Sequence, residues 1–389
     1  MPDIPLDVLN LIFRELDDSL DPTTRRVCVE RRRTVGRAVS LVCRAWRMVG
    51  TRLVWSNVEI ADMRTRKAAS IVEHLIARPK AAGCIGQLRI IWPSCTPCRG
   101  LNYAEHRLPT LLRLVHSLFG LTLSNPPILI IRALSQSTAI RIPSLEYLTI
   151  ERASPENDDS AQSLNGVDLR VLLSLSTVLA KFDLHSAVTS QTSPAASPLP
   201  VRPLESVDIR FAGNTRDVAF VTQTVLRSAD PADMQQLVVA NVPFTPDFYR
   251  TVATFVHLVD FRLAWDFEDG LAFSLPHTAT LIQHLPSLHL LGLMYRHEPA
   301  VQEDHDLSNR LLDLVPSTLN SAVLTLAYTS LSPAPMARYA RTHLGAGPLE
   351  LVALTEEGEI TFLQKKDERE TLKWEEVNRV PLKDSFWRL

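Results

Sequence analysis

A short pattern, apolar-x-x-apolar-x-apolar, recurs along most of this chain and constrains its fold more than any other feature. Because 46% of the residues are hydrophobic, any single match arises by chance about one time in ten. The regular spacing carries the signal, since ten intervals separate Trp55 from Leu349, a mean of about 29 residues. The copies are Trp55-Val58-Ile60, Ile85-Leu88-Ile90, Leu118-Leu121-Leu123, Leu145-Leu148-Ile150, Leu179-Phe182-Leu184, Leu204-Val207-Ile209, Met234-Leu237-Val239, Leu258-Phe261-Leu263 and Leu288-Leu291-Leu293, with two looser ones, Ser321-Leu324-Leu326 and Leu349-Val352-Leu354.

Segments with helical periodicity separate these copies and predict a repeating strand–helix unit. Examples are residues 67–77, 128–134, 167–181, 215–227 and 247–258. A strand and a helix that recur every 20 to 50 residues are typical of a solenoid, in which stacked units bury a continuous core. We therefore predict an α/β fold whose parallel strands line one face and whose helices line the other. A doubly wound α/β domain, with helices on both faces of the sheet, is the alternative.

The repeat pattern resembles irregular leucine-rich repeats. The asparagine that this family carries three positions after the last apolar residue is mostly absent, and Pro93, Pro126 and Ala153 stand in its place. The resemblance implies a leucine-rich-repeat-like α/β solenoid over residues 61–355, and a less regular α/β sheet is the alternative. A Ser/Pro-rich stretch near residues 186–203 has the composition of a disordered or extended insertion.

The C-terminal residues 356–389 differ in character and are predicted to form a cap. Residues 351–363 read as two strands around Glu357-Gly358, which favours a hairpin, and residues 365–379 are highly charged. A polar end unit keeps a solenoid soluble, because the last repeat has no neighbour to cover it.

Side chains alternate along a strand, so the residues between the apolar positions of each copy point away from the core. In the middle copies these positions are polar or charged, which suits a protein or peptide ligand. A solvated sheet face with cross-strand ion pairs explains the same composition equally well. The candidate target-binding residues are Tyr147, Lys181, Asp183, His185, Asp208, Arg210, Asp260 and Arg262.

The composition is that of an ordinary globular protein. The net charge of −2 predicts no strong affinity for nucleic acid or for anionic membranes, and no apolar run is long enough to span a bilayer. Five cysteines and the absence of any Asn-x-Ser/Thr acceptor predict an intracellular location, cytoplasmic or nuclear. Cys95-x-x-Cys98 lacks a paired second half, so free thiols in a loop are the preferred reading over a zinc site, and no cofactor is expected.

Residues 1–60 predict short amphipathic helices. Pro5 suits the first turn of a helix, and Leu9, Ile12, Phe13 and Leu16 fall on one helical face. A second face contains Val39, Val42, Cys43 and Trp46, and Leu53 with Trp55 follows. So thin a layer must bury its apolar stripes against the rest of the chain or against a partner.

In their order, these N-terminal residues resemble an F-box, the helical module that docks a protein onto the Skp-type adaptor of a cullin–RING ubiquitin ligase. The resemblance implies that the chain is a substrate receptor in the ubiquitin conjugation pathway, with an unidentified protein substrate bound by its repeats. The implied adaptor-binding residues are Pro5, Leu6, Leu9, Ile12, Phe13, Leu16, Val42 and Trp46. The alternative is a non-catalytic repeat scaffold, not linked to a ubiquitin ligase, whose residues 1–60 merely cap the solenoid.

No established catalytic motif supports an enzyme. The chain lacks a Gly-x-Ser-x-Gly elbow, a phosphate loop, a His-Glu-x-x-His pair and a Gly-x-Gly-x-x-Gly turn. The sequence therefore predicts a binding protein in three parts, the F-box-like module (1–60), the repeats (61–355) and the cap (356–389).

Overall fold

The computed structural model describes residues 34, 37, 38, 41, 50–52, 54–93, 102–136, 140–151, 166–186, 201–211, 218–240, 245–265, 280–295, 323–328, 350–355, 358–366 and 372–380. The chain divides into two compact units, the first of residues 1–155 with 170–179 and the second of residues 156–169 with 180–389. The adaptor-binding residues predicted between Pro5 and Trp46 lie outside the described residues, and so does the insertion over 187–200.

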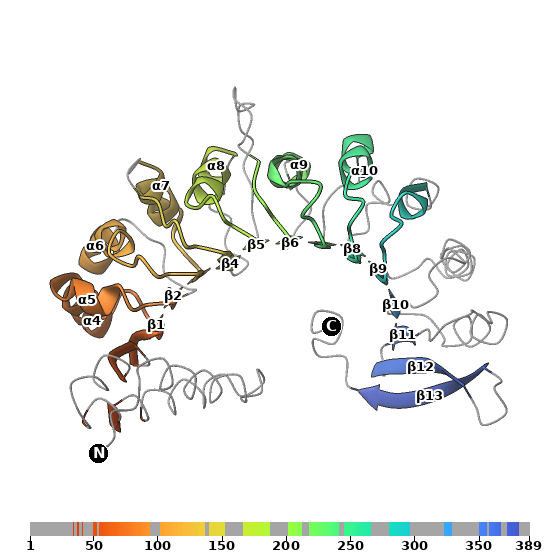
Figure 1. Ribbon diagram of the computed structural model, residues 1–389, viewed down its shortest axis with the longest axis horizontal. Coiled ribbons are helices and arrows are strands. Elements are labelled where there is room, and N and C mark those ends of the chain that lie inside the picture. The colour runs from red at the N-terminus through yellow and green to blue at the C-terminus, as the bar shows by residue number, and fades with distance from the viewer. Residues whose placement is uncertain are drawn as a thin grey trace, which may run out of the picture. The chain divides into compact units, whose positions relative to one another are not determined.

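The first unit alternates strands and helices. Its elements are β1 (Asn57–Ile60), α4 (Arg66–Ala77), α5 (Pro79–Ala82), β2 (Gln87–Ile91), α6 (Tyr103–Leu112), β3 (Gly120–Ser124), α7 (Ile128–Gln136) and β4 (Tyr147–Glu151). The four strands are parallel and lie side by side in chain order. Helices α4, α6 and α7 lie on one side of these strands (Figure 1).

The register of this unit follows from the apolar repeat. Leu88, Leu121 and Leu148 align across β2, β3 and β4, and each is almost completely buried. Most residues at the alternate positions are exposed or partly exposed, because a strand turns successive side chains to opposite faces, although Ser124 at the end of β3 is buried. A one-residue slip would expose every leucine, so burial of the apolar row fixes the register.

Side-chain hydrogen bonds cap the start of helix α6. Asn102 begins α6 with a capping box, in which its Oδ1 accepts from the Glu105 amide (2.9 Å) and the Glu105 carboxylate accepts from the Asn102 amide. Glu105 is buried, and it also accepts a hydrogen bond from Trp92 Nε1 (2.9 Å). The carboxylate therefore ties the start of α6 to the end of the preceding strand.

Asn125 connects adjacent repeats of the first unit by hydrogen bonds at the ends of the strands. Its φ of 55° lies in the left-handed region that asparagine tolerates better than most residues. Its Nδ2 donates to the Trp92 carbonyl of the preceding repeat (3.3 Å), and its amide donates to the Glu151 carbonyl of the following repeat (2.5 Å). Asn125 thus connects neighbouring repeats of the first unit, one position before the site where the repeat family places its asparagine.

The second unit continues the same alternation. Its elements are β5 (Lys181–Ser186), β6 (Ser206–Phe211), α9 (Val218–Ser228), β7 (Gln236–Ala240), α10 (Pro246–Val252), β8 (Asp260–Trp265), β9 (Leu290–Tyr295), β10 (Val323–Tyr328), β11 (Glu350–Thr355), β12 (Gly358–Lys366) and β13 (Leu372–Val380). Strands β5 to β11 are parallel and lie in chain order. Helices α9 and α10 lie on one side of them (Figure 1). Helix α8 (Gly166–Ser174) crosses the division between the units at Leu169.

The predicted α/β fold with parallel strands is confirmed. The strand order follows the chain order in each unit, whereas a doubly wound sheet reverses its order at a switch point. The copies from Trp55 to Leu288 each place their last two apolar residues on strands β1 to β9. This arrangement is open and compatible with a solenoid. No helix among the described residues has both the length and the apolar character needed to cross a membrane.

The C-terminal strands confirm one prediction and correct another. Strand β12 pairs antiparallel with β11 and with β13, as expected for a hairpin after Thr355. The predicted copy Leu349-Val352-Leu354 is wrong by one residue, because Leu324 aligns with Leu351 and not with Val352. Residues 351–354 are all apolar, so their pattern fits either alternation and could not fix the register.

Candidate functional site

The face of each strand set opposite the helices carries the polar side chains of the repeats. In the first unit we call these residues the first strand face: Gln87, Arg89, Thr122, Tyr147, Thr149 and Glu151. In the second unit we call them the second strand face: Lys181, Asp183, His185, Ser206, Asp208, Arg210, Gln236, Asp260 and Arg262.

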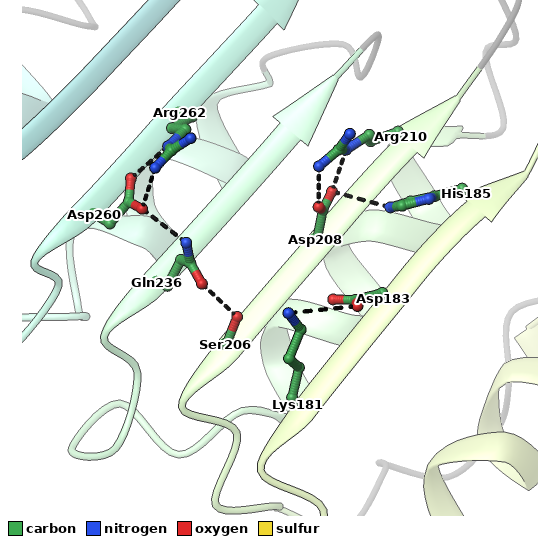
Figure 2. Close-up of polar contacts among 9 residues, drawn as sticks. All are labelled: Lys181, Asp183, His185, Ser206, Asp208, Arg210, Gln236, Asp260 and Arg262. Atoms are coloured by element: carbon green, nitrogen blue, oxygen red, sulfur yellow. Dashed lines mark hydrogen bonds and ion pairs between the residues drawn. The ribbon is translucent and has the colours of Figure 1, made fainter. Parts of the chain in front are cut away.

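Asp208 is the centre of one polar cluster on the second strand face (Figure 2). Its Oδ1 accepts from Arg210 Nε (2.7 Å), and its Oδ2 pairs with Arg210 Nη2, so the contact is bidentate. His185 Nε2 of the adjacent strand β5 lies 3.4 Å from Asp208 Oδ1. On the same strand as His185, Lys181 Nζ lies 3.6 Å from Asp183 Oδ2. Carboxylates on two neighbouring strands therefore hold three groups able to carry positive charge.

A second cluster runs across β6, β7 and β8 as a chain of hydrogen bonds (Figure 2). Ser206 Oγ donates to Gln236 Oε1 (2.9 Å), and Gln236 Nε2 donates to Asp260 Oδ2 (2.7 Å). Asp260 then accepts from Arg262 through Nε and Nη2, both at 2.9 Å. The two contacts of Gln236 fix the orientation of its amide, because one partner is a donor and the other an acceptor.

The electrostatics of Asp208 follow from its surroundings. Burial acts to raise its pKa, but the adjacent His185 ring and the bidentate Arg210 guanidinium outweigh burial. The net effect is that the pKa of Asp208 is lowered from its ordinary value of 3.8. The carboxylate therefore stays ionised and keeps its hold on both partners at neutral pH.

The members of the second strand face differ in their access to solvent. The Arg262 side chain is only 5% exposed, and Val238 and Ala240 on the intervening strand β7 are also buried. Lys181, His185 and Arg210 are partly exposed. The accessible part of this face is thus the cluster on β5 and β6, whereas the Asp260–Arg262 pair lies within a shielded region.

The first strand face is more open. Arg89 Nη2 lies 3.6 Å from Glu151 Oε2, which also accepts from Ser124 Oγ (2.7 Å). Tyr147 is 43% exposed, and its ring meets that of Phe119 edge-on with centroids 6.3 Å apart. The Phe119 ring extends over Gly86, where a Cβ would come within 2.7 Å of it. An exposed aromatic pair thus lies beside a solvent-accessible arginine–carboxylate contact.

The structure brings together most of the target-binding residues predicted from the sequence. Lys181, Asp183 and His185 lie on β5, Asp208 and Arg210 on β6, and Asp260 and Arg262 on β8 (Figure 2). Tyr147 belongs to the first strand face instead. Sequence reasoning missed Gln236, which joins Ser206 of β6 to Asp260 of β8. Its position just before Leu237 in the repeat copy was the signal that could have identified it.

The described residues contain no group of three or more His, Cys, Asp or Glu side chains placed to hold a metal ion. Cys95 and Cys98 lie outside the described residues. The acidic side chains of the second strand face are engaged by cations or amides, which is an arrangement suited to binding and to structural cohesion.

No protein-family model matches this chain, and no curated protein matches it.

Proposed function

We propose that this chain is the substrate-recognition subunit of an SCF-type cullin–RING ubiquitin ligase. Residues 1–60 would dock the Skp-type adaptor as an F-box, and the strand–helix repeats would form a leucine-rich-repeat-like solenoid that binds the protein target. The observation that carries the proposal is the combination, in one chain, of the N-terminal residue order with parallel strands whose described helices all lie on the other side of the sheet. Such a subunit acts inside the cell, in the cytoplasm or the nucleus.

Leu41 supports the docking surface. It precedes Val42 in the second predicted helical face, and it is 82% exposed. Single exposed leucines are common on protein surfaces, so the exposure of Leu41 supports docking only because Leu41 lies within the predicted module. A stable complex of this kind typically buries about 1,600 Å² in total, which would cover such side chains.

The mechanism of a receptor of this class is proximity. The ligase scaffold holds a ubiquitin-loaded conjugating enzyme close to a lysine of the bound target and so raises the effective concentration of the reacting groups. In this proposal the chain contributes binding and orientation, while the conjugating enzyme and the target contribute the reacting atoms.

A pull-down of the full chain with the Skp-type adaptor tests the proposal. Leu9→Asp combined with Trp46→Ala should abolish capture, because it removes an apolar anchor from each helical face. The matched control is Leu129→Asp with Tyr103→Ala, which likewise places an aspartate at a leucine and removes an aromatic ring, at exposed positions on α7 and α6. Equal capture of the wild type and the Leu9/Trp46 variant would contradict the docking assignment.

The second candidate function is a repeat scaffold unconnected with ubiquitin transfer, and one contact favours it. The ring of Trp55, at the end of the predicted module, stacks on His74 of α4 with centroids 5.8 Å apart and planes inclined by 24°. Trp55 thus packs on the repeats. The scaffold predicts that removal of residues 1–55 unfolds the chain, whereas the ligase subunit would stay folded and lose only the adaptor.

A further inference from the structure

On β5 and β6, the side chains that can carry positive charge are more exposed to solvent than the carboxylates. The side chains that can carry positive charge are the outer ones: Lys181 is 41% exposed, His185 31% and Arg210 26%. The carboxylates lie beneath them, with the Asp183 side chain 13% exposed and that of Asp208 14%. A molecule that approaches this part of the face therefore meets the cations first, although the formal charges nearly balance.

Each ion pair acts as a dipole whose positive end points outward. The bidentate contact with Asp208 holds the Arg210 guanidinium in one orientation, and Asp183 holds the Lys181 ammonium. Cations that are already fixed lose less side-chain entropy when a ligand binds, so their attraction for an anion is less offset by ordering. The geometry thus favours negative charge above β5 and β6.

We propose that this cluster is a docking site for an acidic protein segment, whose Asp and Glu carboxylates contact Lys181, His185 and Arg210. Complementary charge is the argument for this occupant, because the accessible groups of the cluster are donors with positive or potentially positive charge. The Asp260–Arg262 pair is excluded from the contact, since the Arg262 side chain is only 5% exposed. That pair supports the sheet beside the site.

This inference goes beyond the ligase assignment. An acidic segment would bind the cluster whether residues 1–60 hold an adaptor or cap the repeats. A negative result with the peptides described below would therefore not affect the assignment of residues 1–60 to adaptor docking. A negative pull-down would not affect the assignment of this site.

The test is fluorescence anisotropy of the full chain with labelled peptides of equal length and common Gly/Ser spacing. The peptides carry Glu, Gln, Lys or phosphoserine at the same positions, and NaCl is held at about 50 mM to limit screening. The Glu peptide should bind about tenfold more tightly than the Gln peptide, and the Lys peptide should bind most weakly.

Lys181→Glu supplies the decisive variant, because it reverses an accessible charge without disturbing the apolar core. It should weaken binding of the Glu peptide about tenfold, and Lys181→Gln should weaken it by a smaller factor. Lys67→Glu is the matched control, since it makes the same charge change at an exposed position on α4 and should leave affinity unchanged.

Three outcomes would overturn the proposal. Equal affinities of the Glu and Gln peptides would remove the role of charge, and equal effects of Lys181→Glu and Lys67→Glu would remove the role of this cluster. Binding of the phosphoserine peptide with little or no binding of the Glu peptide would assign the site to phosphate and not to carboxylates. Circular dichroism of each variant separates lost affinity from lost folding.

Discussion

The first and second strand faces are built on the same parallel register, yet they differ in how fully their polar side chains are engaged. On the first face Tyr147 and Arg89 are exposed, and the described contacts of Arg89 and Ser124 converge on Glu151. On the second face, two arginines are held in bidentate contacts and Gln236 links two strands. The alternation of a strand therefore decides which residues leave the core, while neighbouring side chains decide whether those residues remain accessible.

The sharpest test of this contrast compares the two arginines that pair with carboxylates. Arg262→Ala should lower the free energy of unfolding by about 3–5 kcal/mol, because it leaves Asp260 shielded from water without its charged partner. Arg89→Ala should cost less than about 1 kcal/mol, since its contact with Glu151 is exposed. Urea unfolding followed by circular dichroism measures both changes. Equal losses would show that the arginine–carboxylate pairs of the two faces contribute equally to the free energy of unfolding.

The acid dependence of stability gives the next largest effect. Because the pKa of Asp208 is lowered in the folded state, its contribution is complete above the ordinary value of 3.8 and is lost as the pH falls through the lowered pKa. Asp208→Asn should cost about 1–3 kcal/mol at neutral pH, because a neutral amide accepts weaker hydrogen bonds from Arg210 and attracts His185 less.

Urea unfolding between pH 6 and the acid limit of folding measures this dependence. The wild type should lose stability over the acid range, and Asp208→Asn should lose less, so that the two curves converge at low pH. Parallel curves would show that Asp208 does not contribute to acid sensitivity.

Two glycines of the first unit provide the smallest effect and a matched comparison. Gly86→Ala should cost about 1–2 kcal/mol, because its Cβ would lie 2.7 Å from the Phe119 ring and force that ring away from Tyr147. Gly120→Ala should cost less, since its Cβ would lie 3.3 Å from the Gln87 side chain, which can move aside. Thermal unfolding ranks the pair, and a larger loss for Gly120→Ala would contradict the packing described for Phe119.

The apolar repeat predicted the sheet well because each copy contributes two buried strand residues at a fixed spacing. It failed at β11, where residues 351–354 are all apolar and give no alternation to read. It also missed α6, although Asn102 and Glu105 already had the spacing of a capping box. Local signals of this kind identify an element that periodicity alone leaves out.

The candidate site was predicted in its residues but not in its accessibility. Lys181, Asp208 and Arg262 all occupy outward positions, which the sequence predicts from alternation. The shielding of Arg262 depends on neighbours brought together by the fold, among them Val238 on the adjacent strand. Contacts between strands that are distant in sequence cannot be read from a local pattern, whereas Gln236 stands at an outward position that the pattern does predict.

Hydrogen exchange of the full chain, measured with and without the Skp-type adaptor, is the strongest test of adaptor docking by residues 1–60. We expect the adaptor to slow exchange within residues 1–60 and to leave the strands of both faces unchanged, so that the faces stay available to a target. Unchanged exchange over residues 1–60, or slowed exchange confined to the strands, would contradict adaptor docking.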